Sequence, residues 1–122
     1  MMTQEISAAD CAAFFDSFSH QHQGENVSVE VLDRQFGSQP IARNVPLMGI
    51  TVDPKDQRRF RIEVMTGDSP ADHATHEIGE PVHVRIARSD DGQDRAVEFE
   101  EIGGVTTLVS FGDVDSATTF GR

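Results

Sequence analysis

Residues 72–77, Asp-His-Ala-Thr-His-Glu, form the segment whose residue types are best suited to chemistry. Two imidazoles and two carboxylates lie within these six positions, and such groups are common ligands of divalent metals. In one helical turn His73 and His76 would lie side by side, whereas in an extended strand they would point to opposite faces and could not share an ion. Asp72, His73 and His76 therefore define a candidate metal site; the alternative is a pair of loop histidines that contact only backbone and solvent.

The other histidines considered and the single cysteine have simpler structural interpretations. His20 and His22 come at the end of a predicted helix, where imidazole groups can bind exposed carbonyls. Cys11 lies on the apolar side of that helix, so we interpret it as a small buried hydrophobe and not as a nucleophile. The sequence contains no phosphate-binding glycine loop, nucleophile elbow or paired-cysteine zinc pattern. The absence of these motifs favours a protein that is not an enzyme, with no catalytic residue and no cofactor.

The composition restricts the partners that the protein can have. Of 122 residues, 21 are acidic and 10 are basic, which gives a formal net charge of −11. This charge repels nucleic-acid phosphates and anionic lipids, so neither nucleic acid nor a membrane is an expected partner. Charged residues interrupt every apolar run before it reaches the roughly 20 residues of a membrane-spanning helix. The start of the chain lacks a secretory signal, and a cytoplasmic protein is expected.

An amphipathic helix is predicted over about residues 8–21. Ser7 precedes it as a favourable N-cap, and Gly24 can end it. Spacings of three and four residues place several apolar side chains on one face of this helix: Cys11, Phe14, Phe15 and Phe18. The phenylalanines among them require an apolar surface to pack against.

Alternation of apolar and polar residues with a period of two predicts strands that have one buried face. The segments with this pattern are 27–32, 47–52, 59–64, 82–87, 96–100 and 105–111. Between Gly67 and Pro81 the alternation is lost, and we expect a long loop there with room for one short strand. Loops of that length are often functional.

Turn residues connect these strands into a meander and fix one register. A two-residue Asp91-Gly92 turn would place Ile86 opposite Val97 and Val84 opposite Phe99, so that the apolar faces of both strands coincide. Residues 53–56, Asp-Pro-Lys-Asp, suit a type I turn between two further strands. Gly103-Gly104 predicts another hairpin, whose loop has two or three residues.

The predicted architecture is a single α+β domain over residues 1–122, with the N-terminal helix packed on a curled antiparallel sheet of five to seven strands. The helix covers about 8–21, the β meander about 27–111, and residues 112–122 form a loose tail. The same alternation fits a sheet closed into a small barrel of the SH3 or Sm type and a flat sheet crossed by the helix.

Several segments resemble a group of small acidic bacterial proteins catalogued as a domain of unknown function. The resemblance is carried by the phenylalanine-rich run 13–19, by 29–32, by 46–51 and by the Asp-His-x-Thr-His run within 72–78. It extends over roughly residues 6–111. It implies a free-standing bacterial cytoplasmic protein, and it assigns no role to any residue.

Two functions follow as hypotheses. The first is a non-catalytic domain that acts through protein contacts, including self-association by exposed strand edges or leftover apolar surface to form a homodimer. The second is a protein that binds a metal or small ligand through Asp72, His73, His76 and Glu77.

Overall fold

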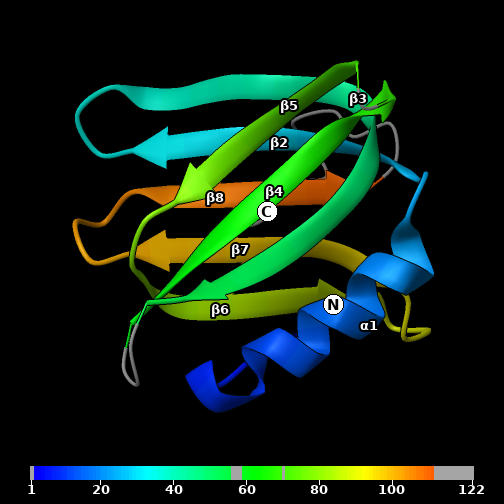
Figure 1. Ribbon diagram of the computed structural model, residues 1–122. Coiled ribbons are helices and arrows are strands. Elements are labelled where there is room, and N and C mark those ends of the chain that lie inside the picture. Colours follow the sequence, from blue (N-terminus) through cyan, green and yellow to red (C-terminus); the bar gives the residue numbers. More distant parts are fainter. Residues whose placement is uncertain (1, 56–58, 70, 112–122) are drawn as a thin grey trace.

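The computed structural model describes residues 2–55, 59–69 and 71–111, and the predicted tail 112–122 lies outside the described residues. Within them, a single α-helix, preceded by a short 3-10 turn, accompanies eight strands, so the protein is mostly β (Figure 1). The elements are β1 (Met2–Glu5), η1 (Ala8–Asp10), α1 (Cys11–His22), β2 (Asn26–Asp33), β3 (Gly37–Pro54), β4 (Phe60–Ser69), β5 (Asp72–Ile78), β6 (Pro81–Arg88), β7 (Asp94–Glu101) and β8 (Thr106–Phe111).

The strands form one antiparallel sheet in the order β1-β6-β7-β8-β2-β3-β4-β5. The first part of β3 pairs with β2, and its second part pairs with β4. This 18-residue strand therefore connects a back layer, formed by β1, β6, β7, β8 and β2, to a front layer, formed by β4 and β5 with the second part of β3. In Figure 1, β4 and β5 cross in front of β2, β8 and β7. The sheet is therefore curled, as predicted, and its apolar residues form one core between the layers.

The strand number exceeds the predicted five to seven because β1 and β5 were not identified as strands. All four residues of β1 are exposed, and β5 contains only one buried residue, so neither segment shows the alternation that marks a half-buried strand. These two strands are the ends of the sheet and do not pair with each other in the described part of the chain. The sheet there is open, and the predicted alternative of a closed barrel is not observed.

The predicted register of β6 and β7 is confirmed, although the predicted turn is wrong. Ile86 lies opposite Val97 and Val84 opposite Phe99. The loop is one residue longer than predicted, because the Ser89 N–H donates to the Gln93 carbonyl at 2.9 Å and Gly92 adopts φ = 86° between them. A register shift beside Arg88 inserts one residue, Arg95, into β7 and restores the predicted pairing.

Two other loop predictions also need correction. β3 continues through Pro54, and the Lys55 N–H donates to the Arg59 carbonyl at 3.0 Å, so the turn begins later than the predicted Asp53–Asp56 segment. Residues 56–58 of that connection lie outside the described residues. The expected long loop between Gly67 and Pro81 is largely the strand β5. The hairpin at Gly104 has the longer of the two predicted loops, since the Glu101 N–H donates to the Val105 carbonyl at 2.8 Å.

Helix α1 packs its phenylalanines against the core as the sequence predicts. Phe15 is fully buried, with its ring centroid 5.5 Å from that of Phe99, and Phe18 lies 5.6 Å from Phe111. The N-terminus differs from the prediction, because the Ser7 hydroxyl donates to the Asp10 carboxylate at 2.9 Å and does not cap the helix. The aromatic contacts place the helix against strands β7 and β8.

The same helix covers the edge of β3 that β2 leaves unpaired. The Ser19 hydroxyl accepts a hydrogen bond from the Ile50 N–H at 2.9 Å and donates one to the Ile50 carbonyl at 3.0 Å. The turn after the helix continues this pairing, since the Gly24 N–H donates to the Leu47 carbonyl and the Leu47 N–H donates to the Glu25 carbonyl, both at 2.8 Å. Helix and turn thus satisfy backbone groups that would otherwise form an exposed strand edge.

His22 joins the end of the helix to the β6–β7 hairpin. Its ring lies between Phe18 and Phe111, with centroid distances of 4.6 and 4.5 Å. Its Nε2 lies 2.8 Å from an Asp94 carboxylate oxygen, and its Nδ1 lies 3.0 Å from Glu25. His22 is buried and contacts carboxylates, whereas the sequence predicted that it binds exposed carbonyls at the helix end.

Candidate functional site

The candidate metal-binding segment is an extended strand at the end of the sheet. Val64 pairs with His76 and Met65 pairs with Thr75. Because directly opposite side chains share a face, His76 points with buried Val64 toward the core. Residues 73, 75 and 77 point to the outer face of the front layer, since side chains alternate along a strand.

This geometry places the predicted metal ligands apart. His73 and His76 lie on opposite faces of β5, which is the arrangement in which they cannot share an ion. In the described ranges, no three His, Cys, Asp or Glu side chains gather in a metal-binding group. The arrangement therefore gives a site at Asp72, His73 and His76 no support, and that site stays a prediction that elemental analysis of the purified protein would test.

His76 instead spans the two layers of the sheet. Its Nε2 lies 3.2 Å from the hydroxyl oxygen of Thr107 on β8, and Thr107 is fully buried. The ring borders a cavity of about 80 Å³ between the two layers, which Ile41 and Ala74 also line. Burial lowers the pKa of His76 below its ordinary value of 6.5, since the charged ring is less well solvated there, and the Glu101 carboxylate opposes this shift.

We expect the buried ring of His76 to make the protein less stable in mild acid. The unfolded chain binds a proton at the ordinary pKa of 6.5, whereas the folded chain binds it only at lower pH. The stabilisation is therefore complete above pH 6.5 and is lost as the pH falls through the folded pKa. Urea unfolding across this range should show a steeper loss of stability for the wild type than for His76→Gln. The matched control, His73→Gln on the exposed face, retains the buried His76 ring and should therefore retain the loss of stability that this ring causes in mild acid. An unchanged slope in His76→Gln would contradict the assignment.

The front layer ends in a strand edge that is open along β5. Among the described residues, β5 pairs only with β4, so the backbone groups on its other side face outward. The segment Asp72–Ile78 contains no proline, no lysine and no residue with positive φ. Proline, lysine and local backbone irregularities are features by which soluble proteins prevent edge strands from pairing, and this edge lacks them.

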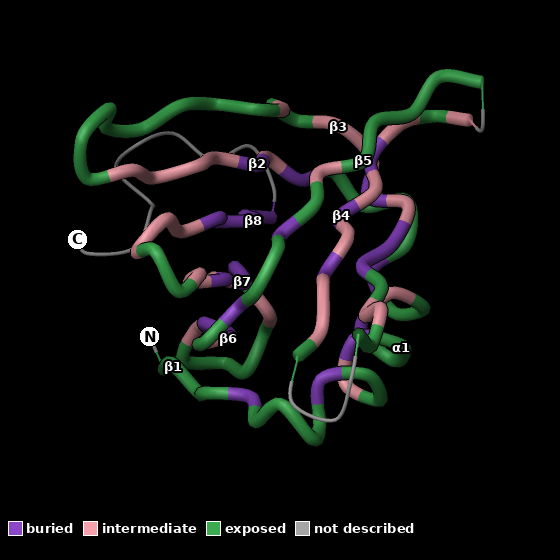
Figure 2. Tube along the Cα trace, turned by 60° about the vertical axis from the view of Figure 1, so that its left-hand side comes forward, coloured by how far each residue is buried: buried purple, intermediate pink, exposed green. Residues whose placement is uncertain are grey.

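The first part of β3 is a second open edge with the opposite character. Residues 37–46 pair only with β2 in the described part of the chain, but this stretch contains Pro40, and Asn44 has φ = 54°. Proline cannot donate a ladder hydrogen bond, and the shifted registers between Val27 and Glu30 disturb the ladder beside it. Figure 2 shows the first part of β3, residues 37–46, as largely exposed and extending past β5. Its Ile41 is 51% exposed.

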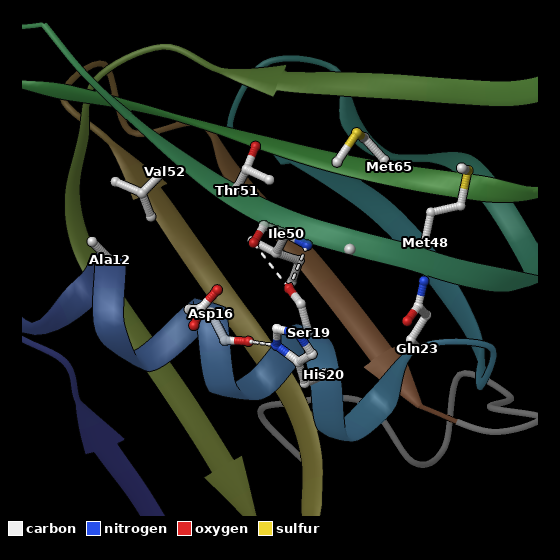
Figure 3. Close-up of a pocket in the computed structure, with 11 residues that line it drawn as sticks. Ala12, Asp16, Ser19, His20, Gln23, Met48, Ile50, Thr51, Val52 and Met65 are labelled. Atoms are coloured by element: carbon white, nitrogen blue, oxygen red, sulfur yellow. Dashed lines mark hydrogen bonds between the residues drawn. The ribbon is translucent and has the colours of Figure 1, made fainter. Parts of the chain in front are cut away.

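A groove of about 390 Å³ lies on the face of the front layer that points away from the core, between α1 and the strands β3 and β4 (Figure 3). The helix contributes Asp16, Ser19 and His20 to one wall. Met48 and Met65 contribute thioether side chains from the strands. The residues come from positions far apart in the sequence, and no local motif predicted the groove.

Two residues considered in the sequence take structural roles. His20 Nδ1 lies 2.8 Å from the carbonyl oxygen of Asp16, one turn back inside the helix, whereas the sequence predicted contact with the exposed carbonyls at the helix end. Cys11 is fully buried, and burial raises the pKa of its thiol to about 11. A thiol that remains protonated is a poor nucleophile, which agrees with its interpretation as a small hydrophobe.

In the described part of the chain, no helix combines the length and apolarity needed to cross a bilayer.

The fold and these surfaces define a small protein built on one antiparallel sheet, in which a single helix covers the edge of β3. Residues 2–119 match a family of unknown function, DUF5335, and the chain belongs to this family. This confirms the resemblance seen in the sequence. An "Uncharacterized protein" from the bacterium Aquifex aeolicus (strain VF5) is 34% identical over 56 residues, a region that covers 46% of this chain and 50% of the relative. No solved structure matches.

Proposed function

We propose that this protein is a non-catalytic cytoplasmic domain that acts through protein contacts, and that it self-associates by pairing the β5 strands of two copies. The observation that carries this proposal is the open edge of Asp72–Ile78, which lacks the blocking features found on the first part of β3. An edge of seven residues is long enough for a regular ladder, whereas the other end of the sheet, β1, has four.

The sequence of β5 is complementary to itself in antiparallel pairing. A two-fold axis at Thr75 places His73 opposite the partner's Glu77, and symmetry repeats this pair on the other side of the axis. His73 and Glu77 both lie on the outer face of the strand. The imidazole N–H of His73 can donate to the Glu77 carboxylate of the other copy, and such polar pairs directly across a ladder stabilise the pairing by about 0.2–1 kcal/mol each. Ile41, beside the inner face of β5, offers apolar surface close to the same edge.

The net charge of −11 on each copy opposes this association through long-range repulsion. Salt screens charges separated by more than about 10 Å at roughly 0.1 M, whereas close contacts across the ladder are screened less. The dimer should therefore form more readily at moderate ionic strength than at very low ionic strength. Sedimentation velocity over a range of salt concentrations would follow this dependence.

A charge exchange on β5 tests the pairing directly. His73→Glu should weaken dimerisation by roughly tenfold, because it places two carboxylates opposite each other at both symmetry-related positions. The double variant His73→Glu with Glu77→His restores an imidazole opposite each carboxylate across the axis and should recover the dimer. The intrachain ion pair of Arg61 with Glu77, at 3.0 Å, is exposed, and its loss should cost little.

The matched control is Thr3→Glu, which adds the same carboxylate to the exposed strand at the other end of the sheet. It should leave the dimerisation constant within about twofold, in keeping with a distant surface change. A chain that remains monomeric up to about 1 mM would refute the proposal. So would a double variant that fails to recover association while it remains folded.

A further inference from the structure

The groove between α1 and the front layer points to a second interaction surface, separate from the β5 edge. Its volume of about 390 Å³ is within the range of sites that bind ligands or several side chains. Figure 3 shows the helix residues Asp16 and His20 on one side, with Thr51, Val52 and Met65 on the strands facing them. The lining residues from β3 are consecutive, from Met48 to Val52, so the groove follows this strand over a length that suits a short extended segment.

The apolar part of the groove includes Gly49, a buried residue of β3. A Cβ atom there would lie 3.6 Å from the Ser19 Oγ and 3.9 Å from the Met65 Cε, which are ordinary contact distances. The position thus accepts a methyl group without steric conflict, so the glycine leaves a space of about that size beside Met65. Methionine side chains adapt to differently shaped apolar partners. This part of the groove is suited to an aliphatic side chain.

Hydrogen-bond acceptors line the polar part of the groove. Asp16 contributes an exposed carboxylate. Glu63 does not line the groove, but it lies opposite Thr51 in the β3–β4 ladder and adds negative charge to the same outer face. His20 Nδ1 must donate to the Asp16 carbonyl, since a carbonyl oxygen only accepts, so Nε2 of the neutral ring is an acceptor. Acceptors and negative charge together select a cationic donor, and the charge of the whole chain has the same sign.

We propose that this groove binds a short extended segment of a partner protein in which an aliphatic side chain is flanked by arginine. The aliphatic side chain would occupy the space beside Gly49 and Met65, and a guanidinium would bind the Asp16 carboxylate. Arginine pairs with carboxylates through a planar fork of donors, which gives this contact direction as well as charge. This inference goes beyond the proposed self-association, because it concerns a different partner and a different face.

Fluorescence anisotropy with the full chain can test the proposal, using a fluorescein-labelled, amidated peptide Gly-Arg-Leu-Arg-Gly as the probe. We expect saturable binding that is weaker by about tenfold for Gly-Glu-Leu-Glu-Gly and Gly-Arg-Ser-Arg-Gly, which each lack one of the two features. Arginine amide alone should bind more weakly than the probe. Equal binding of arginine amide would overturn the assignment to a peptide segment.

Two variants locate the binding in the groove. Asp16→Asn should weaken binding of the probe by about tenfold, and Gly49→Ala should weaken it by about threefold because the methyl group occupies the aliphatic subsite. The matched control is Ala13→Arg, an exposed position on the same helix outside the groove, which makes the same one-unit change in net charge. If Asp16→Asn and Ala13→Arg weaken binding equally, or if no saturation occurs up to about 1 mM, the proposal is wrong. His73→Glu should bind the probe like the wild type, so this test does not depend on dimerisation.

Discussion

Replacement of His22 by alanine is expected to lower the free energy of unfolding by about 3 kcal/mol. The ring is buried between Phe18 and Phe111, so its removal leaves a cavity between two aromatic side chains. It also removes a partner at 2.8 Å from the Asp94 carboxylate, which is only 11% exposed. Loss of a partner from a largely buried charged group costs more than the contact itself contributes.

Urea unfolding, monitored by circular dichroism, would measure this change from the shift in the midpoint. His22→Phe separates the two causes, because it fills the space but does not contact the carboxylate, so its loss should be intermediate. Arg88 still donates to Asp94 at 3.0 Å in that variant and limits the cost. His20→Ala, on the exposed side of the same helix, should stay within about 0.5 kcal/mol of the wild type. A His22→Ala loss below about 1 kcal/mol would show that the ring does not join helix and hairpin.

Replacement of Phe99 by alanine should have a still larger effect, about 4 kcal/mol. Phe99 is fully buried on β7, where it meets Phe15 of the helix and pairs with Val84 across the ladder. Its loss opens a cavity where the helix, the back layer and the core meet. Domains of this size have total stabilities of about 5–15 kcal/mol, so the variant should be close to unfolding.

Thermal unfolding of Phe99→Ala, Phe99→Leu and Phe36→Ala would measure this contribution. Phe99→Leu keeps most of the apolar volume and should lose about half as much as the alanine variant. Phe36 is 72% exposed in the β2–β3 hairpin, so Phe36→Ala should fall within about 0.5 kcal/mol of the wild type. Equal losses at positions 36 and 99 would contradict the assignment of the core.

The sequence predicted those parts of the fold in which burial leaves a periodic pattern. The spacing of Phe15 and Phe18 predicted α1, and alternation predicted the β6–β7 register. That register was correct even though its turn was not, because burial of Val97 and Phe99 on one face restricts the pairing more strongly than the loop does. The extra residue is absorbed by the bulge at Arg95.

The parts of the sheet that were missed contain few buried residues. β1 has none, β5 has only Ile78, and the first part of β3 is polar and mostly exposed, so none of them shows an apolar alternation. His22 was misinterpreted as a cap although its position carried a usable signal. Cys11, Phe15, Phe18 and His22 follow spacings of four, three and four, which places His22 on the buried stripe.

The candidate sites required the three-dimensional arrangement. The run 72–78 was recognised as unusual, but its place at the end of the sheet depends on pairing with β4, which no local rule specifies. The groove beside Gly49 combines a helix with a strand some 30 positions later in the chain, as the 31-residue separation of Ser19 and Ile50 shows. Such contacts follow from the packing of the helix on β3.

The pairing of β1 with β6 has a consequence for how the protein is made. Met2 lies opposite Arg88, and the helix that follows β1 reaches its aromatic neighbours only on β7 and β8. A ribosome releases the N-terminus first, so these early residues emerge long before the strands that shelter them have been translated. The phenylalanines of the helix stay uncovered until β7 and β8 have been translated, a period in which exposed apolar surface favours aggregation and engages chaperones. Folding of the helix onto the sheet therefore depends on contacts between distant segments, which form slowly.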